Sequence, residues 1–136
     1  GHVFDFFKKL QNNPKELKIL GNGKQRKSYL YIHDCLNAIM ISIKYFKKQI
    51  NIINLGHDDY CTVNQSVKWI TKNLNIKPKL IYSGGKQGWI GDNPFIYLDN
   101  RKIKKTGWKP KTSIEEGIIK TLNYLKNNTW LLDLRN

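Results

Sequence analysis

Apolar residues recur every three or four positions in five stretches of the chain, and this spacing predicts five helices. The first stretch contains Phe4, Phe7 and Leu10 and is stopped by Pro14, which cannot continue a helix. The other four helices are expected at about residues 35–47, 63–74, 99–107 and 114–127. Helices should therefore supply much of the packing surface.

Capping residues indicate where three of these helices begin. Thr62-x-x-Gln65 and Ser113-x-x-Glu116 are capping boxes, in which two side chains satisfy backbone amides that lack a partner in the first helical turn. Asp34 is expected to cap the helix that follows it through one carboxylate oxygen.

Short strands are expected between the helices. Polar and apolar residues alternate over residues 27–32, which is the pattern of a strand with one buried face. Apolar runs predict further strands at residues 17–20, 79–82 and 95–98, and a buried strand at residues 50–55. Because strands and helices alternate without a repeat or an internal boundary, the sequence predicts one α/β domain over residues 1–136.

The helix expected at residues 35–47 is apolar on nearly every side. Leu36, Ile39, Met40 and Ile43 lie on one face, and further apolar residues lie elsewhere around the helix. A helix of this kind is usually buried on more than one side. We therefore expect it to pack against another part of a longer protein, and we expect this chain alone to form a homodimer or to be marginally stable.

The net charge of +14 comes almost entirely from lysine. The arginines Arg26, Arg101 and Arg135 are spread along the chain. Proteins that read bases concentrate arginine on one helix or loop, because its planar fork matches guanine edges. The charge pattern therefore argues against a nucleic-acid partner, although a basic module that binds nucleic acid or an acidic protein is kept as an alternative.

Nothing in the sequence pattern directs the chain to a membrane or to export. No apolar run approaches the roughly 18 residues of a membrane helix, and no secretory pattern is visible. Cys35 and Cys61 lack the spacing of a zinc site or a disulfide framework. We therefore expect a cytoplasmic protein, and the start at Gly1, directly before an amphipathic pattern, is typical of a segment taken from a longer one.

Catalytic and cofactor motifs are missing from the sequence pattern. Gly21-x-Gly23 lacks a third glycine and leads towards a strand, so it does not match the turn that binds the pyrophosphate of NAD. Tyr82 and Lys86 have the spacing of a Tyr-x-x-x-Lys catalytic pair, but the glycines between them disfavour a helix. The histidines and carboxylates lack metal-ligand spacing. No catalytic residue and no metal is therefore expected here.

Four motifs, in order along the chain, resemble one known family. They are residues 20–35 (LGNGKQRKSYLYIHDC), residues 54–56 (NLG), residues 88–94 (GWIGDNP) and residues 107–117, which contain GWKP and SIEEG. Together they are similar to the carboxy-terminal part of extended short-chain dehydrogenases of the NAD-dependent epimerase/dehydratase family. The similarity is greatest to UDP-glucose 4-epimerases of the archaeal type.

The resemblance carries expectations about fold and function. It implies a substrate-binding carboxy-terminal domain with short strands, about five helices and no complete Rossmann fold. It also implies a UDP-sugar substrate and an amino-terminal half that binds NAD, so that this chain alone is inactive and binds no cofactor. A sugar-nucleotide 4,6-dehydratase or dehydrogenase of the same family carries the same motifs and stays open as an alternative.

Substrate-binding residues follow from the resemblance, position by position. The backbone of Lys18 and Leu20 matches positions that read uracil, and Lys27 matches an arginine that binds phosphate. Tyr29 lies beside Lys27, and Asp92 matches a carboxylate on the ribose side. Each also has an ordinary structural interpretation: the lysines as solvated strand residues, Tyr29 as a packing residue and Asp92 as a turn former.

The chain departs from the family pattern at two positions. Lysine replaces the usual arginine at position 27, although Arg26 adjoins it, and Trp89 stands where the substrate loop often has an arginine. Lysine is a point charge and tryptophan can only stack, so the identity of the nucleotide is left open.

Overall fold

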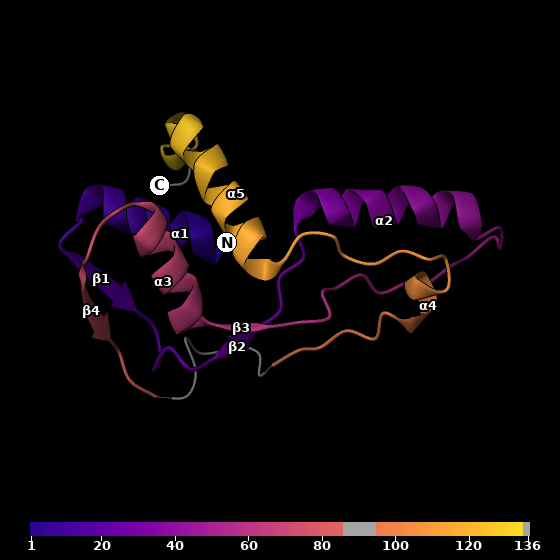
Figure 1. Cartoon of the computed structure of the whole chain (residues 1–136), viewed down its shortest axis with the longest axis horizontal. Coiled ribbons are helices and arrows are strands. Elements are labelled where there is room, and N and C mark those ends of the chain that lie inside the picture. The colour runs from indigo at the N-terminus through magenta and orange to yellow at the C-terminus, as the bar shows by residue number, and fades with distance from the viewer. Residues whose placement is uncertain (86–94, 135–136) are drawn as a thin grey trace.

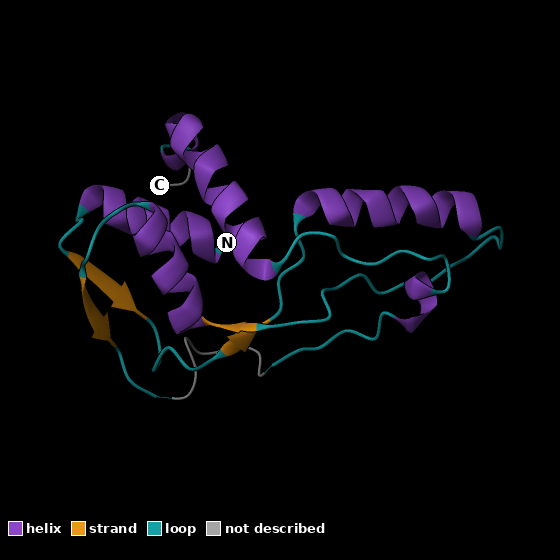
Figure 2. Cartoon of the chain, in the orientation of Figure 1, coloured by secondary structure: helices purple, strands orange, loops and turns teal. Residues whose placement is uncertain are grey.

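A computed structural model describes residues 1–85 and 95–134 of the chain. The described elements are α1 (His2–Asn12), β1 (Glu16–Ile19), β2 (Arg26–Lys27), α2 (Ile32–Tyr45), β3 (Cys61–Thr62), α3 (Val63–Asn73), β4 (Lys79–Tyr82), α4 (Arg101–Lys104), α5 (Ile114–Asn127) and the 3₁₀ helix η1 (Thr129–Leu132). They form two lobes: α1, α3, α5, β1 and β4 lie at one end, and α2 and α4 lie at the other (Figures 1 and 2). The short β2–β3 ribbon and several extended segments lie between the lobes.

The larger lobe is built on the parallel pairing of β1 with β4. Leu17 pairs with Leu80 and Ile19 pairs with Tyr82. Leu17 and Ile19 are almost fully buried and pack in the main core together with residues of α1, α3 and α5. The sheet is thus covered by helices on the side to which Leu17 and Ile19 point.

The smaller lobe has little core of its own. Its buried apolar residues are Ala38 of α2, Ile103 of α4 and Trp108. The long apolar face of α2 lies outside this cluster, with Met40 56% and Ile43 65% exposed. The structure therefore leaves uncovered the helix that the sequence predicts to be buried on more than one side.

The predicted strand at residues 27–32 is wrong beyond Lys27. Residues 28–31 have no regular structure, and α2 begins at Ile32. The Ser28 hydroxyl donates to the Asp59 carbonyl at 2.8 Å, which ties this segment to a loop instead of to a strand. Alternation over so few residues does not distinguish a strand from an extended connection.

The prediction that Asp34 caps α2 is also wrong. Tyr31 occupies the N-cap position, and no side chain caps the helix there. Asp34 is buried in the first turn, and its carboxylate accepts a hydrogen bond from the backbone amide of Thr112 at 2.9 Å. Its role is therefore to join α2 to the segment that precedes α5.

Neither of the strands predicted at residues 50–55 and 95–98 is found. Both segments are extended but pair with no other strand among the described residues. Ile50 and Ile52 are 79% and 82% exposed, so the predicted burial of this segment is wrong for the chain alone. A short apolar run indicates that a segment is suited to a sheet. Whether it forms a strand depends on a neighbouring strand with which it can pair.

Both predicted capping sequences mark real helix starts. Thr62 and Gln65 form the complete reciprocal box at the start of α3, and the Ser113 side chain accepts the Glu116 amide at the start of α5. The predicted helix at 99–107 is shorter than expected and covers Arg101–Lys104. Among the described residues, no helix combines the length and apolar character that a membrane span needs.

Candidate functional site

The edge of β1 that faces away from β4 carries the backbone groups of Lys18 and Leu20. The Ile19 carbonyl accepts the Ser83 amide at 3.0 Å, so Ile19 bonds towards β4. Alternate residues of a strand bond to opposite sides, so Lys18 and Leu20 present their backbone groups to the other edge. No other strand within the described part of the chain pairs with that edge.

Two side chains lie along this edge of β1. The Lys9 ammonium group donates to the Lys18 carbonyl at 3.3 Å, and the Gln25 amide donates to the Leu20 carbonyl at 2.9 Å. The Gln25 Oε1 atom is buried and has no hydrogen-bond partner among the described residues. Gln25 is thus a polar residue of the candidate site that the sequence analysis did not predict. It lies within the motif of residues 20–35.

The turn that leads from β1 to β2 is fixed against the start of α3. The Val63 and Asn64 amides donate to the carbonyls of Gln25 and Gly23 at 3.1 and 2.9 Å. Gly23 has a φ of 73°, which favours glycine, and a Cβ atom there would lie 1.9 Å from Asn64 Oδ1 and would displace that side chain. Because these amides and that of Gln65 already have partners, the amino end of α3 is not available to an anion.

Arg26 and Lys27 follow this turn on β2. Arg26 pairs with Thr62 and Lys27 with Cys61 across the antiparallel ribbon. The Arg26 guanidinium carbon lies 5.3 Å from the centre of the Tyr60 ring. Lys27 is half-buried on the same strand. Both predicted cations are therefore held close to the turn that contains Leu20.

Tyr29 serves mainly as a packing residue in this structure. Its ring stacks on the His2 ring with centroids 4.2 Å apart and contacts the edge of the main core. The His2 Nε2 atom is 2.7 Å from the Ser66 hydroxyl, which joins this stack to α3. The structural interpretation of Tyr29 therefore has direct support, and its role in substrate binding stays a prediction.

His2 should make the stability of the folded chain depend on pH. Burial, and then the positive charge of the amino terminus, lower the pKa of His2 from 6.5 to about 4. Between these values the unfolded chain binds the proton and the folded chain does not, so stability should fall as the pH falls through this window, by up to about 1.4 kcal/mol per pH unit. Urea unfolding between pH 6.5 and 5 measures this slope.

The matched variant for this measurement is His2→Gln, which keeps a polar group near Ser66 but does not titrate. Its unfolding free energy should change less with pH than that of the wild type over the same window. Equal slopes in the two proteins would show that His2 is not the group responsible.

Asp92 and Trp89 lie outside the described residues, so their predicted roles are not addressed by the structure. The residues on either side of residues 86–94 contact the turn between β1 and β2. The Ser83 hydroxyl accepts the Gly21 amide at 2.8 Å, and the Arg26 guanidinium carbon lies 4.7 Å from the centre of the Phe95 ring. Both flanks of that segment are thus held beside the turn between β1 and β2.

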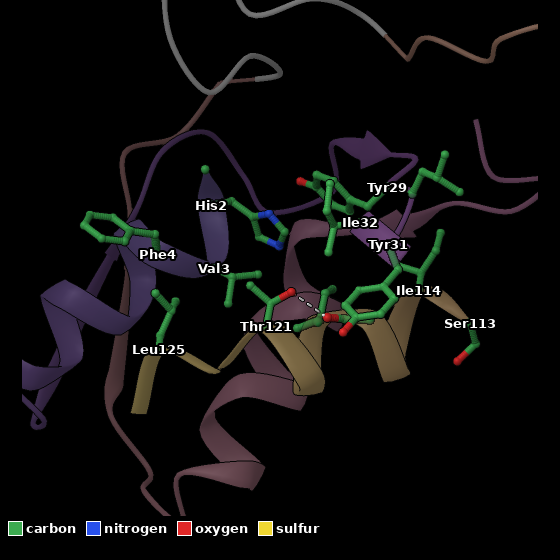
Figure 3. A pocket seen from close by; sticks show the side chains of 14 residues that line it. His2, Val3, Phe4, Tyr29, Tyr31, Ile32, Ser113, Ile114, Thr121 and Leu125 are labelled. Atoms are coloured by element: carbon green, nitrogen blue, oxygen red, sulfur yellow. Dashed lines mark hydrogen bonds between the residues drawn. The ribbon is translucent and has the colours of Figure 1, made fainter. Parts of the chain in front are cut away.

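A cavity of about 360 Å³ lies between the start of α1, residues 29–32 and α5 (Figure 3). Its walls are mainly apolar, with Tyr29, Tyr31 and Thr121 contributing polar groups. The Thr121 hydroxyl already donates to the Gly117 carbonyl at 2.7 Å. The residues that line this cavity include none of Lys18, Leu20 and Lys27, so the predicted nucleotide edge is an open surface and not the wall of a described cavity.

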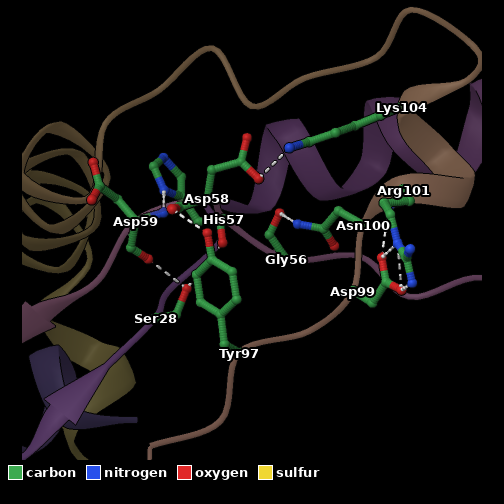
Figure 4. Close-up of polar contacts among 10 residues, drawn as sticks. All are labelled: Ser28, Gly56, His57, Asp58, Asp59, Tyr97, Asp99, Asn100, Arg101 and Lys104. Carbon is green, nitrogen blue, oxygen red and sulfur yellow. Dashed lines mark hydrogen bonds and ion pairs between the residues drawn. The ribbon is translucent and has the colours of Figure 1, made fainter.

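A second hollow of about 320 Å³ lies where α4 meets the loop after Gly56 (Figure 4). Lys104 pairs with Asp58 at 2.6 Å and lowers the pKa of that carboxyl group. Hydrogen bonds from Arg101 lower the pKa of Asp99 to about 2. The charges in this hollow are thus already paired.

Among the described residues, Gly21 and Gly23 do not have the strand–turn–helix arrangement that binds the pyrophosphate of NAD. The Gly21–Gly23 turn leads into β2, and the Asn64 side chain fills the space in front of Gly23. Tyr82 lies at the end of β4, and its hydroxyl donates to Asn64 Oδ1 at 2.9 Å. Lys86, the lysine of the Tyr-x-x-x-Lys spacing, lies outside the described residues.

Comparison with known proteins gives consistent relatives but no match to a family model. A Methanocaldococcus jannaschii protein, named provisionally as a UDP-glucose 4-epimerase, is 28% identical over 94% of this chain and 40% of its own length. The GDP-L-colitose synthase of Yersinia pseudotuberculosis is 30% identical over 87% of this chain and 37% of its length. The chain thus spans about two-fifths of the length of these relatives.

The fold has equally clear relatives. The crystal structure of the Thermotoga maritima UDP-glucose 4-epimerase with UDP-glucose matches with a TM-score of 0.78 and 28% identity, over 95% of this chain and 40% of that one. The matched region is the carboxy-terminal portion of such enzymes. Over most of its length the chain therefore resembles the carboxy-terminal part of extended short-chain dehydrogenases of the NAD-dependent epimerase/dehydratase family.

Proposed function

We propose that this chain is the nucleotide-sugar-binding part of an NAD-dependent epimerase that acts on UDP-hexoses, of the UDP-glucose 4-epimerase type. The observation that carries the proposal is the outward edge of β1 at Lys18 and Leu20, which lies beside the turn that leads to Lys27. A strand edge offers an adjacent hydrogen-bond donor and acceptor, which the imide edge of uracil requires. A cation nearby suits the diphosphate.

The division of roles within the site follows from this chemistry. The backbone of Lys18 and Leu20 binds the base, and the Lys27 ammonium group binds a diphosphate oxygen. Asp92 bridges the ribose hydroxyls. This assignment is supported by the contacts of Ser83 and Phe95, which lie on either side of residues 86–94 and are both held near the turn between β1 and β2. No catalytic step is assigned to these residues.

An amino-terminal half that binds NAD completes the proposed enzyme and carries its catalytic tyrosine and lysine. Two observations support this half as the partner of the chain. The chain matches only about two-fifths of the length of its relatives, and α2 exposes a long apolar face that a partner would cover. The chain alone should therefore bind a UDP-sugar weakly and should not epimerise it.

Isothermal titration calorimetry of the chain with UDP-glucose, UDP, GDP and CMP tests this proposal. Lys27→Gln should weaken UDP binding about tenfold, because it removes a charge-assisted contact. Lys72→Gln makes the same charge change at the exposed end of α3 and should have little effect. Equal affinities for UDP and GDP, or equal losses in the two variants, would count against the proposal.

Two other functions predict different results. Relatives include a UDP-glucose 4,6-dehydratase, and analysis of the products formed by a full-length parent separates 4-epimers from 4-keto-6-deoxy or oxidised sugars. A nucleic-acid-binding module would show DNA affinity that falls steeply with salt, along a slope that reflects several phosphate contacts.

A further inference from the structure

Arg26 lies against two aromatic rings that come from different parts of the chain. Its guanidinium carbon is 4.7 Å from the centre of the Phe95 ring and 5.3 Å from that of the Tyr60 ring. These two rings contact each other with centroids 5.0 Å apart. The Tyr97 hydroxyl donates to the Asp58 carbonyl, which fixes the same segment to the loop before β3. Arg26, Tyr60 and Phe95 thus form a cluster of side chains in mutual contact, although the Arg26 side chain is exposed to solvent.

The two cations of β2 face opposite ways. Successive residues of a strand point to opposite faces, so the side chains of Arg26 and Lys27 leave β2 in opposite directions. A diphosphate bound on one face therefore meets one of the two cations. The rings of Tyr60 and Phe95 occupy the Arg26 face, where the attraction between cation and ring quadrupole holds the guanidinium group in place.

The cluster joins three segments that the proposed nucleotide site depends on. Arg26 begins β2 after the turn that follows Leu20, Tyr60 precedes β3, and Phe95 lies in the segment that leads to α4. Lys27 is the next residue after Arg26, and its backbone pairs with Cys61. Any loosening of the cluster would therefore change the position of Lys27.

We infer that Arg26 is a positioning residue of the nucleotide site, which holds β2 against Tyr60 and Phe95 so that Lys27 alone meets the diphosphate. The inference rests on the proposed function. It predicts that removal of Arg26 weakens nucleotide binding because Lys27 is displaced. Removal of Lys27 weakens binding because a positive charge at the diphosphate is lost.

Titration of the chain with UDP and UMP separates the two roles. Arg26→Gln should weaken UDP binding about two- to fivefold, and Arg26→Lys should restore part of the affinity. In a Lys27→Gln background, where no ammonium group is left to position, Arg26→Gln should have little further effect. Lys27→Gln should weaken UDP binding more than UMP binding, and more strongly at low salt. An Arg26→Gln loss that is equally large in the Lys27→Gln background would overturn the inference, because Arg26 would then act on the nucleotide independently of Lys27.

Phe95→Leu provides the second arm of the test, because it removes the ring but no charge. It should reproduce the loss seen in Arg26→Gln, and the double variant should lose little more than either single one. Additive losses, or no effect of Phe95→Leu, would overturn the inference.

Amide hydrogen exchange gives a readout that needs no nucleotide. In Arg26→Gln the amides of residues 26–27 and 61–62 should exchange about two- to fivefold faster than in the wild type, whereas Lys27→Gln should leave them unchanged. Unchanged exchange in Arg26→Gln would overturn the positioning role. Faster exchange in a chain that binds no UDP would uphold the positioning of β2 and reject the proposed function.

Discussion

The chain should self-associate through α2, and the double variant Met40→Glu/Ile43→Glu should abolish that association. Leu36, Ile39, Met40 and Ile43 are 52%, 41%, 56% and 65% exposed on α2 and form a continuous apolar face. Burial of one such side chain is worth about 1.5–3 kcal/mol, so two copies that cover this face against each other gain enough to offset part of the cost of association. Sedimentation velocity over a range of concentrations measures the change.

The control for this prediction is Tyr124→Glu, which places a carboxylate on an apolar side chain of α5 that is 60% exposed. Glutamates lower the net charge of +14, so they reduce general repulsion between copies and cannot dissociate a dimer in that way. A wild-type chain that stays monomeric at high concentration would contradict the prediction. Dissociation by Tyr124→Glu to the same degree would show that α2 is not the surface involved.

Leu122→Ala should destabilise the chain by about 2–5 kcal/mol, because it opens a cavity where no side chain can move in to fill it. Leu122 is fully buried in the main core, on the face of α5 that packs against α1 and α3. A domain of this size has about 5–15 kcal/mol of stability in total, so the loss is a large part of it. Urea unfolding followed by circular dichroism gives the free energy of unfolding of each protein.

Tyr124→Ala is the matched control on the same helix. Its side chain is exposed, so the free energy of unfolding should change by less than about 0.5 kcal/mol. Alanine favours the helix at least as much as leucine or tyrosine, so equal destabilisation by the two variants would show that burial in the core does not decide the loss.

Local sequence signals located the elements of the larger lobe correctly. The apolar spacing of α1 and the capping box of α3 depend on residues within one or two helical turns, and both are found where they are predicted. The strand at β4 is also found, because its apolar run has a partner in β1. Within this lobe, local preference and tertiary packing favour the same structure.

The errors fall where a segment depends on partners that the described residues do not provide. Ile50 and Ile52 form part of a run that suits a buried strand, yet they are exposed because no strand lies beside them. The apolar helix α2 is predicted correctly as a helix but lies uncovered for the same reason. The sequence pattern indicates which kind of neighbours a segment suits. The structure shows which of those neighbours are present among the described residues.

The candidate site could be predicted only in part. The resemblance led to Lys18, Leu20 and Lys27, and the structure places the first two on the outward edge of β1, with Lys27 just beyond the adjoining turn. The cluster around Arg26 could not be predicted, because Tyr60 and Phe95 are far from it in sequence and carry no motif. Contacts of this kind depend on the turn geometry that Gly23 and Asn64 set.

The parallel pairing of β1 with β4 has a consequence for how this lobe forms. The two strands lie far apart along the chain, so a large loop must close before either gains a partner. High contact order of this kind slows folding, and it means that neither strand with its adjacent helix is a stable unit alone. The outward edge of β1 is therefore set in place only when segments distant in the sequence have come together.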